Sequence, residues 1–188
     1  MLQINRRCAE NTRPEAVREG CRGDSLRLIH SSSSRIARPL PYHDSAADQL
    51  GSDKYVIRLE SGDDILQSLR QFATAKRLSA SLLEGIGSLS KVKLGHYDFK
   101  TKQYRYETFE DDLEILNLSG NISSMNHQPL PHVHVTLGRR DFSVIGGHLD
   151  DGSSANMVEI GIWKLSGKLL KAKDDAIGLN VLQLARRI

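Results

Sequence analysis

From Lys54 onward, the sequence consists of short segments rich in β-branched and apolar residues, separated by turn residues at close intervals. The segment Lys54–Glu60 (KYVIRLE) alternates apolar and polar residues, as a strand with one buried face does. The Gly, Asp, Asn and Ser residues between segments make turns that are too short for crossover connections, so neighbouring strands must run antiparallel. This pattern restricts the chain to a largely antiparallel sheet.

One segment has a different period. Ser61–Asp64 (SGDD) offers an N-cap with acidic residues in the first turn, and apolar residues then recur at helical spacing from Ile65 to about Leu78. We expect a helix there. The segments that follow have the length and composition of strands: SASLLEGIGSL, KVKLGHYDF, QYRYETF, LEILNLSGNIS, HVHVTLG, FSVIGGHL and NMVEIGIWKLSG. The predicted fold is α+β, with a largely antiparallel sheet of seven or eight strands flanked by one or two helices.

Residues 1–50 have a different character. Their eight basic residues are all arginines, Ser31–Ser34 is a serine run, and no apolar period is sustained. Because such a segment buries too little apolar surface to offset the entropy of ordering, we expect a disordered arm at 1–50 and a folded domain at 51–188. Apolar runs are too short to span a membrane, and no signal-peptide h-region follows the early arginines. We therefore expect a cytoplasmic protein with free thiols at Cys8 and Cys21.

Three of the seven histidines, His132, His134 and His148, lie within the short stretch Pro131–Leu149. Residues i and i+2 of a strand share a face, so His132 and His134 point to one side and the intervening valines to the other. If the loop around Arg139–Asp141 has three residues, the return strand sets His148 opposite His132; a two-residue loop would turn it away. Cross-strand partners about 4.5–5.5 Å apart at Cβ can direct two imidazoles at one ion.

These histidines have two interpretations. Three neutral imidazoles suit Zn²⁺ or another borderline divalent ion and leave a fourth position open for water or substrate. Gly146 and Gly147, directly before His148, permit a bulge or a close backbone approach. The alternative is that His132 and His134 line a solvated or interface face, while His148 hydrogen-bonds at a strand end. The residues alone leave both interpretations open.

Other residues are secondary candidates. Glu84 is a general base or a ligand if it faces the histidines, and otherwise an exposed strand residue. Gly85 and Gly87 indicate a bulged turn between strands. Trp163 is interpreted as a core residue or as an anchor at a subunit interface.

The segments EGIGSLSKVKLGHYD, EILNLSGNIS and HVHVTL…VIGGHL, in this order after a strand and a helix, resemble the plant and prokaryote conserved (PPC) domain over about residues 55–184. The resemblance implies a homotrimer, an antiparallel sheet flanked by helices, and membership of a group described as predicted DNA-binding proteins. The fold also resembles acetolactate decarboxylase, whose metal is held by a His-x-His pair and a later histidine. That resemblance implies a metal at His132, His134 and His148. The loop MNHQPLP departs from the family, which often has Asp-Gly before the proline, and His127 in this loop is a candidate fourth ligand.

The charge pattern gives little support to strong DNA binding. The AT-hook core Arg-Gly-Arg-Pro of the plant relatives does not occur in the sequence. Residues 51–188 contain 18 basic and 17 acidic residues, so DNA contact requires basic residues to gather on one face. Arg139 and Arg140, at the expected hairpin tip, are candidates for this role, or else ordinary solvated charges.

Two functions of different class follow. The first is a homotrimeric PPC-domain protein acting as a DNA-associated or regulatory binding module, with a possible zinc or other divalent metal site and no membrane association. The alternative is a metal-dependent enzyme acting on a small carbonyl-bearing acid, in which the ion would polarise substrate oxygens. Whether the protein is an enzyme stays open at this point.

Overall fold

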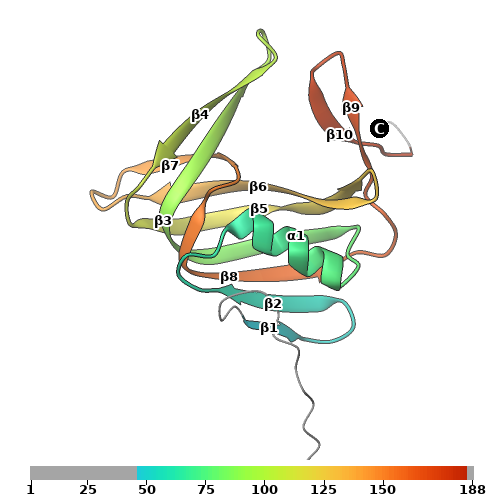
Figure 1. Cartoon of the computed structure of the whole chain (residues 1–188), viewed down its shortest axis with the longest axis horizontal. Helices are drawn as coiled ribbons and strands as arrows, with labels where there is room; N and C mark the ends of the chain where they lie inside the picture. The colour runs from blue at the N-terminus through green and yellow to red at the C-terminus, as the bar shows by residue number, and fades with distance from the viewer. Residues whose placement is uncertain (1–45, 186–188) are drawn as a thin grey trace, which may run out of the picture. The chain divides into compact units, whose positions relative to one another are not determined.

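The computed structural model describes residues 46–185. Figure 1 shows one helix beside a large curved sheet. The elements in chain order are β1 (Ala46–Gln49), β2 (Lys54–Leu59), α1 (Ile65–Ala75), β3 (Ser81–Asp98), β4 (Gln103–Phe109), β5 (Leu113–Met125), β6 (Gln128–Gly138), β7 (Val144–Leu149), β8 (Ser154–Lys164), β9 (Lys171–Asp174) and β10 (Leu179–Leu182). The α+β prediction is confirmed.

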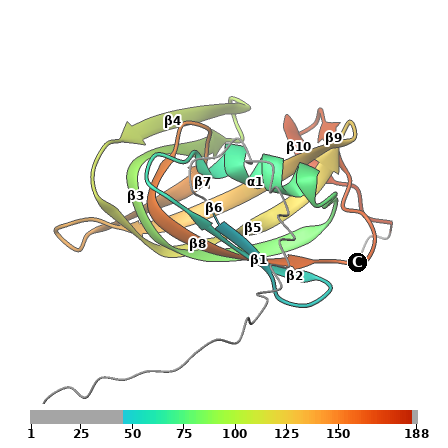
Figure 2. The same cartoon turned by 60° about the horizontal axis from the view of Figure 1, so that its bottom comes forward.

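Every pairing between the named strands is antiparallel, as short turns require. Eight strands form one sheet in the order β1-β2-β8-β3-β5-β6-β7, with β4 paired to β3, while β9 and β10 form a separate hairpin. Strand β7 also pairs with the far end of β3, through Leu94 with Leu149 and Gly95 with His148. The sheet therefore curls until β3, β5, β6 and β7 make a closed ring, and its curvature is visible in Figure 2.

The long strand β3 makes this closure possible. Two separate strands were predicted in Ser81–Asp98, but the segment is one strand of 18 residues. The bulged turn expected at Gly85 and Gly87 is instead a bulge within β3, where the register to β5 shifts between these two residues. A bulge increases local bend and twist, so one continuous strand pairs with β5 and β8 near its start and with β4 and β7 near its end.

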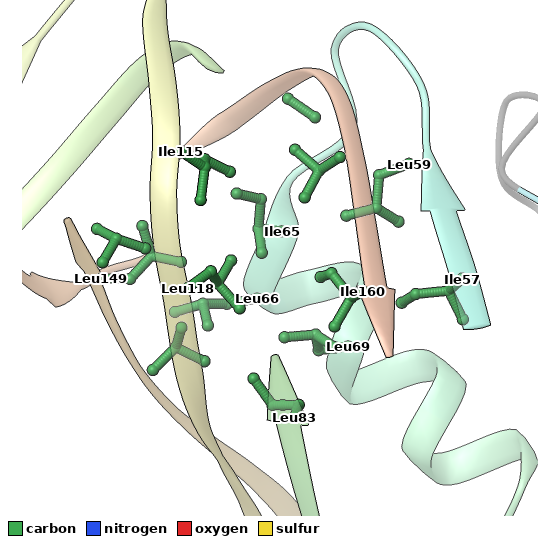
Figure 3. Close-up of a cluster of buried hydrophobic side chains, with 14 of the residues drawn as sticks. Ile57, Leu59, Ile65, Leu66, Leu69, Leu83, Ile115, Leu118, Leu149 and Ile160 are labelled. Carbon is green, nitrogen blue, oxygen red and sulfur yellow. The ribbon is translucent and has the colours of Figure 1, made fainter. Parts of the chain in front are cut away.

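Helix α1 covers one face of the sheet. The N-cap predicted within Ser61–Asp64 is Asp64, whose carboxylate accepts a hydrogen bond from the backbone N–H of Gln67 at 2.8 Å. The prediction of acidic residues in the first turn was wrong, because the helix begins only after Asp64, at Ile65. The buried side of the helix packs on the inward residues of the strands, shown in Figure 3 with Leu69 near Leu83 and Ile160. Because inward and outward residues alternate along each strand, the opposite face carries the remaining side chains.

The arm expected at residues 1–50 lies outside the described residues except for 46–50, where β1 pairs with β2. The expectations for Cys8 and Cys21 likewise fall outside them. Within residues 46–185, no helix has the length and apolar character needed to cross a membrane.

Candidate metal centre

Strand β6 places its residues on alternate faces of the sheet. Val133 and Val135 are buried in the core, whereas His132 is half-buried and His134 exposed on the opposite side. Strand β5 comes very close to β6 at Gly120, where a Cβ atom would lie 2.1 Å from the carbonyl oxygen of His132. The histidine pair is therefore held on a tightly paired strand whose other face is anchored in the core.

Strand β7 brings His148 to the same face, but with a different partner from the one that a three-residue loop predicts. The β6–β7 connection is five residues long, from Arg139 to Ser143, so His148 lies opposite His134 and not opposite His132. The longer loop moves each partner along β6 by two residues, which preserves the face because side chains alternate with a period of two. The predicted face of His148 is confirmed. The predicted cross-strand partner, His132, was wrong.

Gly146 and Gly147, directly before His148, allow the close backbone approach that was predicted for them. A Cβ at Gly146 would lie 2.6 Å from the carbonyl oxygen of Val135 on β6, and one at Gly147 would lie 3.0 Å from that of Gly95 on β3. Side chains at these positions would push β7 away from both neighbours. The glycines thus let β7 fit between β6 and β3 and bring His148 to the other two histidines.

The three imidazoles form a compact group. Ring centroids lie 5.2 Å apart for His132 and His134, 5.1 Å for His132 and His148, and 5.5 Å for His134 and His148. One ligand atom from each ring can be chosen so that all three lie within 4.8 Å of one another. Nitrogens around a tetrahedral zinc ion are separated by about 3.3 Å, given metal–nitrogen distances of roughly 2.0–2.1 Å. Small side-chain rotations would therefore bring the three rings onto one ion.

The environment of the group favours the neutral form of two of its imidazoles, those of His132 and His148. Burial lowers the pKa of His132 to about 4, helped by the positive charge of Lys171 and by the other two histidines. Burial also lowers the pKa of His148, with a further contribution from His134. Neutral imidazole is the form that binds a metal ion, so protons would compete weakly for His132 and His148 near neutral pH.

An unsatisfied polar atom supports the fit of a metal to these residues. The Nδ1 atom of His148 is buried and has no hydrogen-bond partner among the described residues. A buried polar atom without a partner carries a desolvation cost of about 1–3 kcal/mol. Coordination to an ion would satisfy this nitrogen, and the donor set of three imidazoles suits zinc.

The histidines line a cavity of about 540 Å³. Its walls come from the β3–β4 hairpin, which contributes Tyr97, Phe99 and Tyr104, and from the β9–β10 hairpin, which contributes Lys171, Leu179 and Asn180. Both hairpins rise from the sheet in Figure 1. The sequence interpretation missed the second hairpin, although KAKD and LNVL around the turn at 175–178 give a short strand–turn–strand signal.

The other predicted site residues lie apart from the histidine group. Glu84 lies on the same sheet face as the histidines. Ser119 on β5 pairs with Glu84 on one side and with His134 on the other, so Glu84 and His134 are two strand spacings apart, about 10 Å. His127 is exposed in the two-residue turn between β5 and β6, where its positive φ of 64° fits a tight hairpin. Neither residue joins the three-histidine group.

Arg139 and Arg140 lie in the β6–β7 loop, as expected. The Arg139 guanidinium lies over the Phe109 ring, 5.4 Å from its centroid, while Arg140 is exposed. Trp163 is 39% exposed and therefore not a core residue of the single chain.

By its fold, this chain is a small α+β protein with a ring-closed antiparallel sheet, one covering helix and a histidine-lined pocket. The family model for the Plants and Prokaryotes Conserved (PCC) domain matches residues 48–166. A proposed DNA-binding protein from Bacteroides thetaiotaomicron is 33% identical, with 76% of this chain and 99% of that one covered and a TM-score of 0.71. A metal-containing protein from Archaeoglobus fulgidus is 30% identical (74% and 99% covered, TM-score 0.67).

A plant- and prokaryote-conserved (PPC) protein from Pyrococcus horikoshii is 25% identical over 76% of this chain and 96% of its own, with a TM-score of 0.68. Among curated proteins, none is similar enough to count as a match. The chain belongs to the PPC domain family.

Proposed function

We propose that this PPC-domain protein is a metal-dependent binding module, in which His132, His134 and His148 hold a zinc ion at the floor of an open pocket. The observation that carries the proposal is the convergence of three ligand atoms within 4.8 Å on one rigid sheet face. The orphaned Nδ1 atom of His148 and the metal-containing relative from Archaeoglobus fulgidus support it. A bound divalent ion would supply a Lewis-acidic centre with an open coordination position.

Elemental analysis of the full chain tests the metal site. We expect about one zinc per chain in the wild type and a loss of most of it in His132→Ala and His148→Ala. His127→Ala is the matched control, because this exposed turn histidine lies apart from the group. Equal zinc content in all four proteins would rule out the three ligands.

We further propose that the module is a homotrimer assembled through the sheet face opposite α1. That face carries exposed apolar side chains on four neighbouring strands, namely Val56, Leu82, Ile86, Leu116, Met157 and Trp163, which we call the apolar sheet patch. A contiguous patch of this kind marks an interaction surface. A second copy is the occupant favoured by the homotrimer that the PPC family implies.

The oligomeric state can be measured by sedimentation in the full chain. Leu82→Asp with Ile86→Asp should dissociate the trimer, because two charges would have to be buried unpaired in the interface. Phe142→Asp is the control, since Phe142 is 92% exposed in the β6–β7 loop, outside the patch. A wild type that sediments as a monomer at micromolar concentration would refute the proposed trimer.

DNA association is a second candidate, favoured by the relative from Bacteroides thetaiotaomicron and by the exposed loop position of Arg140. Trimerisation would present three copies of the Arg139–Arg140 pair. If these arginines contact phosphates, Arg139→Ala with Arg140→Ala should weaken DNA binding and reduce its salt dependence. Binding that is already unmeasurable in the wild type at low salt would exclude this role.

The enzymatic alternative, a metal-dependent reaction on a small carbonyl-bearing acid, is favoured by the access that the 540 Å³ cavity gives to the histidines. The described lining residues of the cavity include no carboxylate and no arginine; Lys171 is its cation. This composition favours binding of an anion at the metal over carboxylate-driven acid–base chemistry.

A further inference from the structure

The β9–β10 hairpin lies after the residues that the family model matches, yet it is firmly attached to the pocket. At its base, the backbone N–H of Ser124 on β5 donates to the carbonyl of Leu169 at 2.7 Å. At its turn, the Tyr97 hydroxyl donates to the carbonyl of Ile177 at 2.6 Å, and the Lys102 ammonium donates to that of Asp175 at 3.2 Å. Side chains of the β3–β4 hairpin therefore hold the backbone of the β9–β10 turn, and the two hairpins line the histidine pocket from two sides.

Lys171, the first residue of β9, brings a cation into this pocket. Its side chain is partly buried and lines the same cavity as the three histidines. None of the six ion pairs formed within residues 46–185 includes Lys171. Burial lowers the pKa of Lys171, and its positive charge contributes to the lowered pKa values of His132 and His148, with which it shares the cavity lining.

With a divalent ion bound at the proposed site, this arrangement would leave positive charge without a counterion among the described lining residues. Three neutral histidines do not compensate a divalent ion, and Lys171 adds a further positive charge in the same partly desolvated space. The other walls are largely apolar or aromatic, with Phe99, Tyr104, Leu130, Pro131 and Leu179 among them. The metal-loaded cavity would thus combine a concentrated positive charge with surfaces that suit a hydrocarbon or ring.

We propose that Lys171 makes this pocket a receptor for a small organic anion, whose acid group lies between the metal and the Lys171 ammonium while its apolar body packs against the aromatic and aliphatic walls. The proposal rests on the proposed metal site for one of its two charges. Lys171 is the residue that selects an anion over a neutral ligand of the same shape, because a charge-assisted hydrogen bond is lost when the acid group is neutral.

Benzoate and benzamide are matched probes, since they share a ring and size but differ in charge. Binding to the zinc-loaded full chain is measured by calorimetry for the wild type, Lys171→Met and Lys171→Arg. Lys173→Met is the control, because Lys173 lies on the same strand but is exposed and paired with Asp175 at 3.4 Å. Zinc content and thermal unfolding are measured on the same samples.

We expect the wild type and Lys173→Met to bind benzoate in preference to benzamide, and Lys171→Met to lose benzoate affinity by about tenfold or more while keeping its zinc. Lys171→Arg should retain most of the preference, which separates loss of charge from loss of fold. Equal benzoate affinity in the wild type and Lys171→Met would overturn the proposal, as would a wild type that does not discriminate the probes. A wild type without zinc would refute the metal site alone, and benzoate binding lost in Lys171→Met would then still support the role of Lys171.

Discussion

His148 on β7 lies directly opposite His134 on β6, with their ring centroids 5.5 Å apart. His148 also pairs with Gly95 on β3, so two strands fix its backbone. A ligand held by paired strands on both sides has little freedom to move, which is the support that a metal-binding geometry requires. The histidine group is therefore a property of the closed sheet and not of a loop.

Metal removal should destabilise the protein. A ligand that binds only the folded state adds about 2.7 kcal/mol at a free concentration of 100 times its Kd. We expect a chelator to lower the Tm by several degrees and added Zn²⁺ to restore it. His134→Ala should abolish this response, whereas His127→Ala, in the exposed β5–β6 turn outside the histidine group, should retain it. A Tm that is unchanged by chelation would contradict the prediction.

Because β5 lies so close to β6 at Gly120, adding a single methyl group there should strongly destabilise the protein. Gly120→Ala would place a Cβ 2.1 Å from the backbone oxygen of His132, so the strands must separate. Overpacking of this kind costs about 1–3 kcal/mol or more, and it should also weaken zinc binding because it moves His132. Gly138→Ala is the control, since its Cβ would meet only the Leu116 side chain at 3.4 Å. Chemical denaturation measures the free energy of unfolding of both variants. An equal loss of stability in the two would contradict the steric explanation.

The metal-free protein should lose stability as the pH falls. The pKa of His132 is lowered from 6.5 to about 4 in the folded state, and that of His148 is lowered as well. The unfolded chain then binds more protons than the folded one between about pH 6.5 and 4, so the free energy of unfolding decreases through this window. Urea unfolding at several pH values checks it. His132→Ala should flatten the profile, and an unchanged slope would show that another group is responsible.

The N-cap of α1 should contribute measurably to stability. The Asp64 carboxylate accepts hydrogen bonds from the backbone N–H of Gln67 at 2.8 Å and from that of Gly152 at 2.7 Å. It thereby ties the helix to the turn before β8. Asp64→Ala should cost about 1–2 kcal/mol, and Asp64→Asn, which keeps one acceptor, should cost less. Equal unfolding midpoints for the wild type and Asp64→Ala would contradict this.

The sequence alone predicted the parts of the site that depend on local period. Alternation along HVHVTL puts His132 and His134 on one face and the valines in the core, and this holds whatever the rest of the chain does. The motifs that resemble the PPC domain could also be identified from the sequence, because each is a run of contiguous residues. An N-cap within Ser61–Asp64 was predictable because capping depends on the next few residues only, whereas the structure assigns it to Asp64.

Only the tertiary structure decided how distant segments meet. The partner of His148 depends on the length of the Arg139–Ser143 loop. Lys171 enters the pocket through a hairpin whose hydrogen-bond partners, Ser124 and Tyr97, lie 45 and 80 positions earlier in the chain. Local periodicity predicts neither the partner of His148 nor the position of Lys171. Strand register and hairpin docking are set by non-local backbone pairing and by the bend at the β3 bulge. The sequence determined which faces the side chains occupy, and the closure of the sheet determined which of them share a pocket.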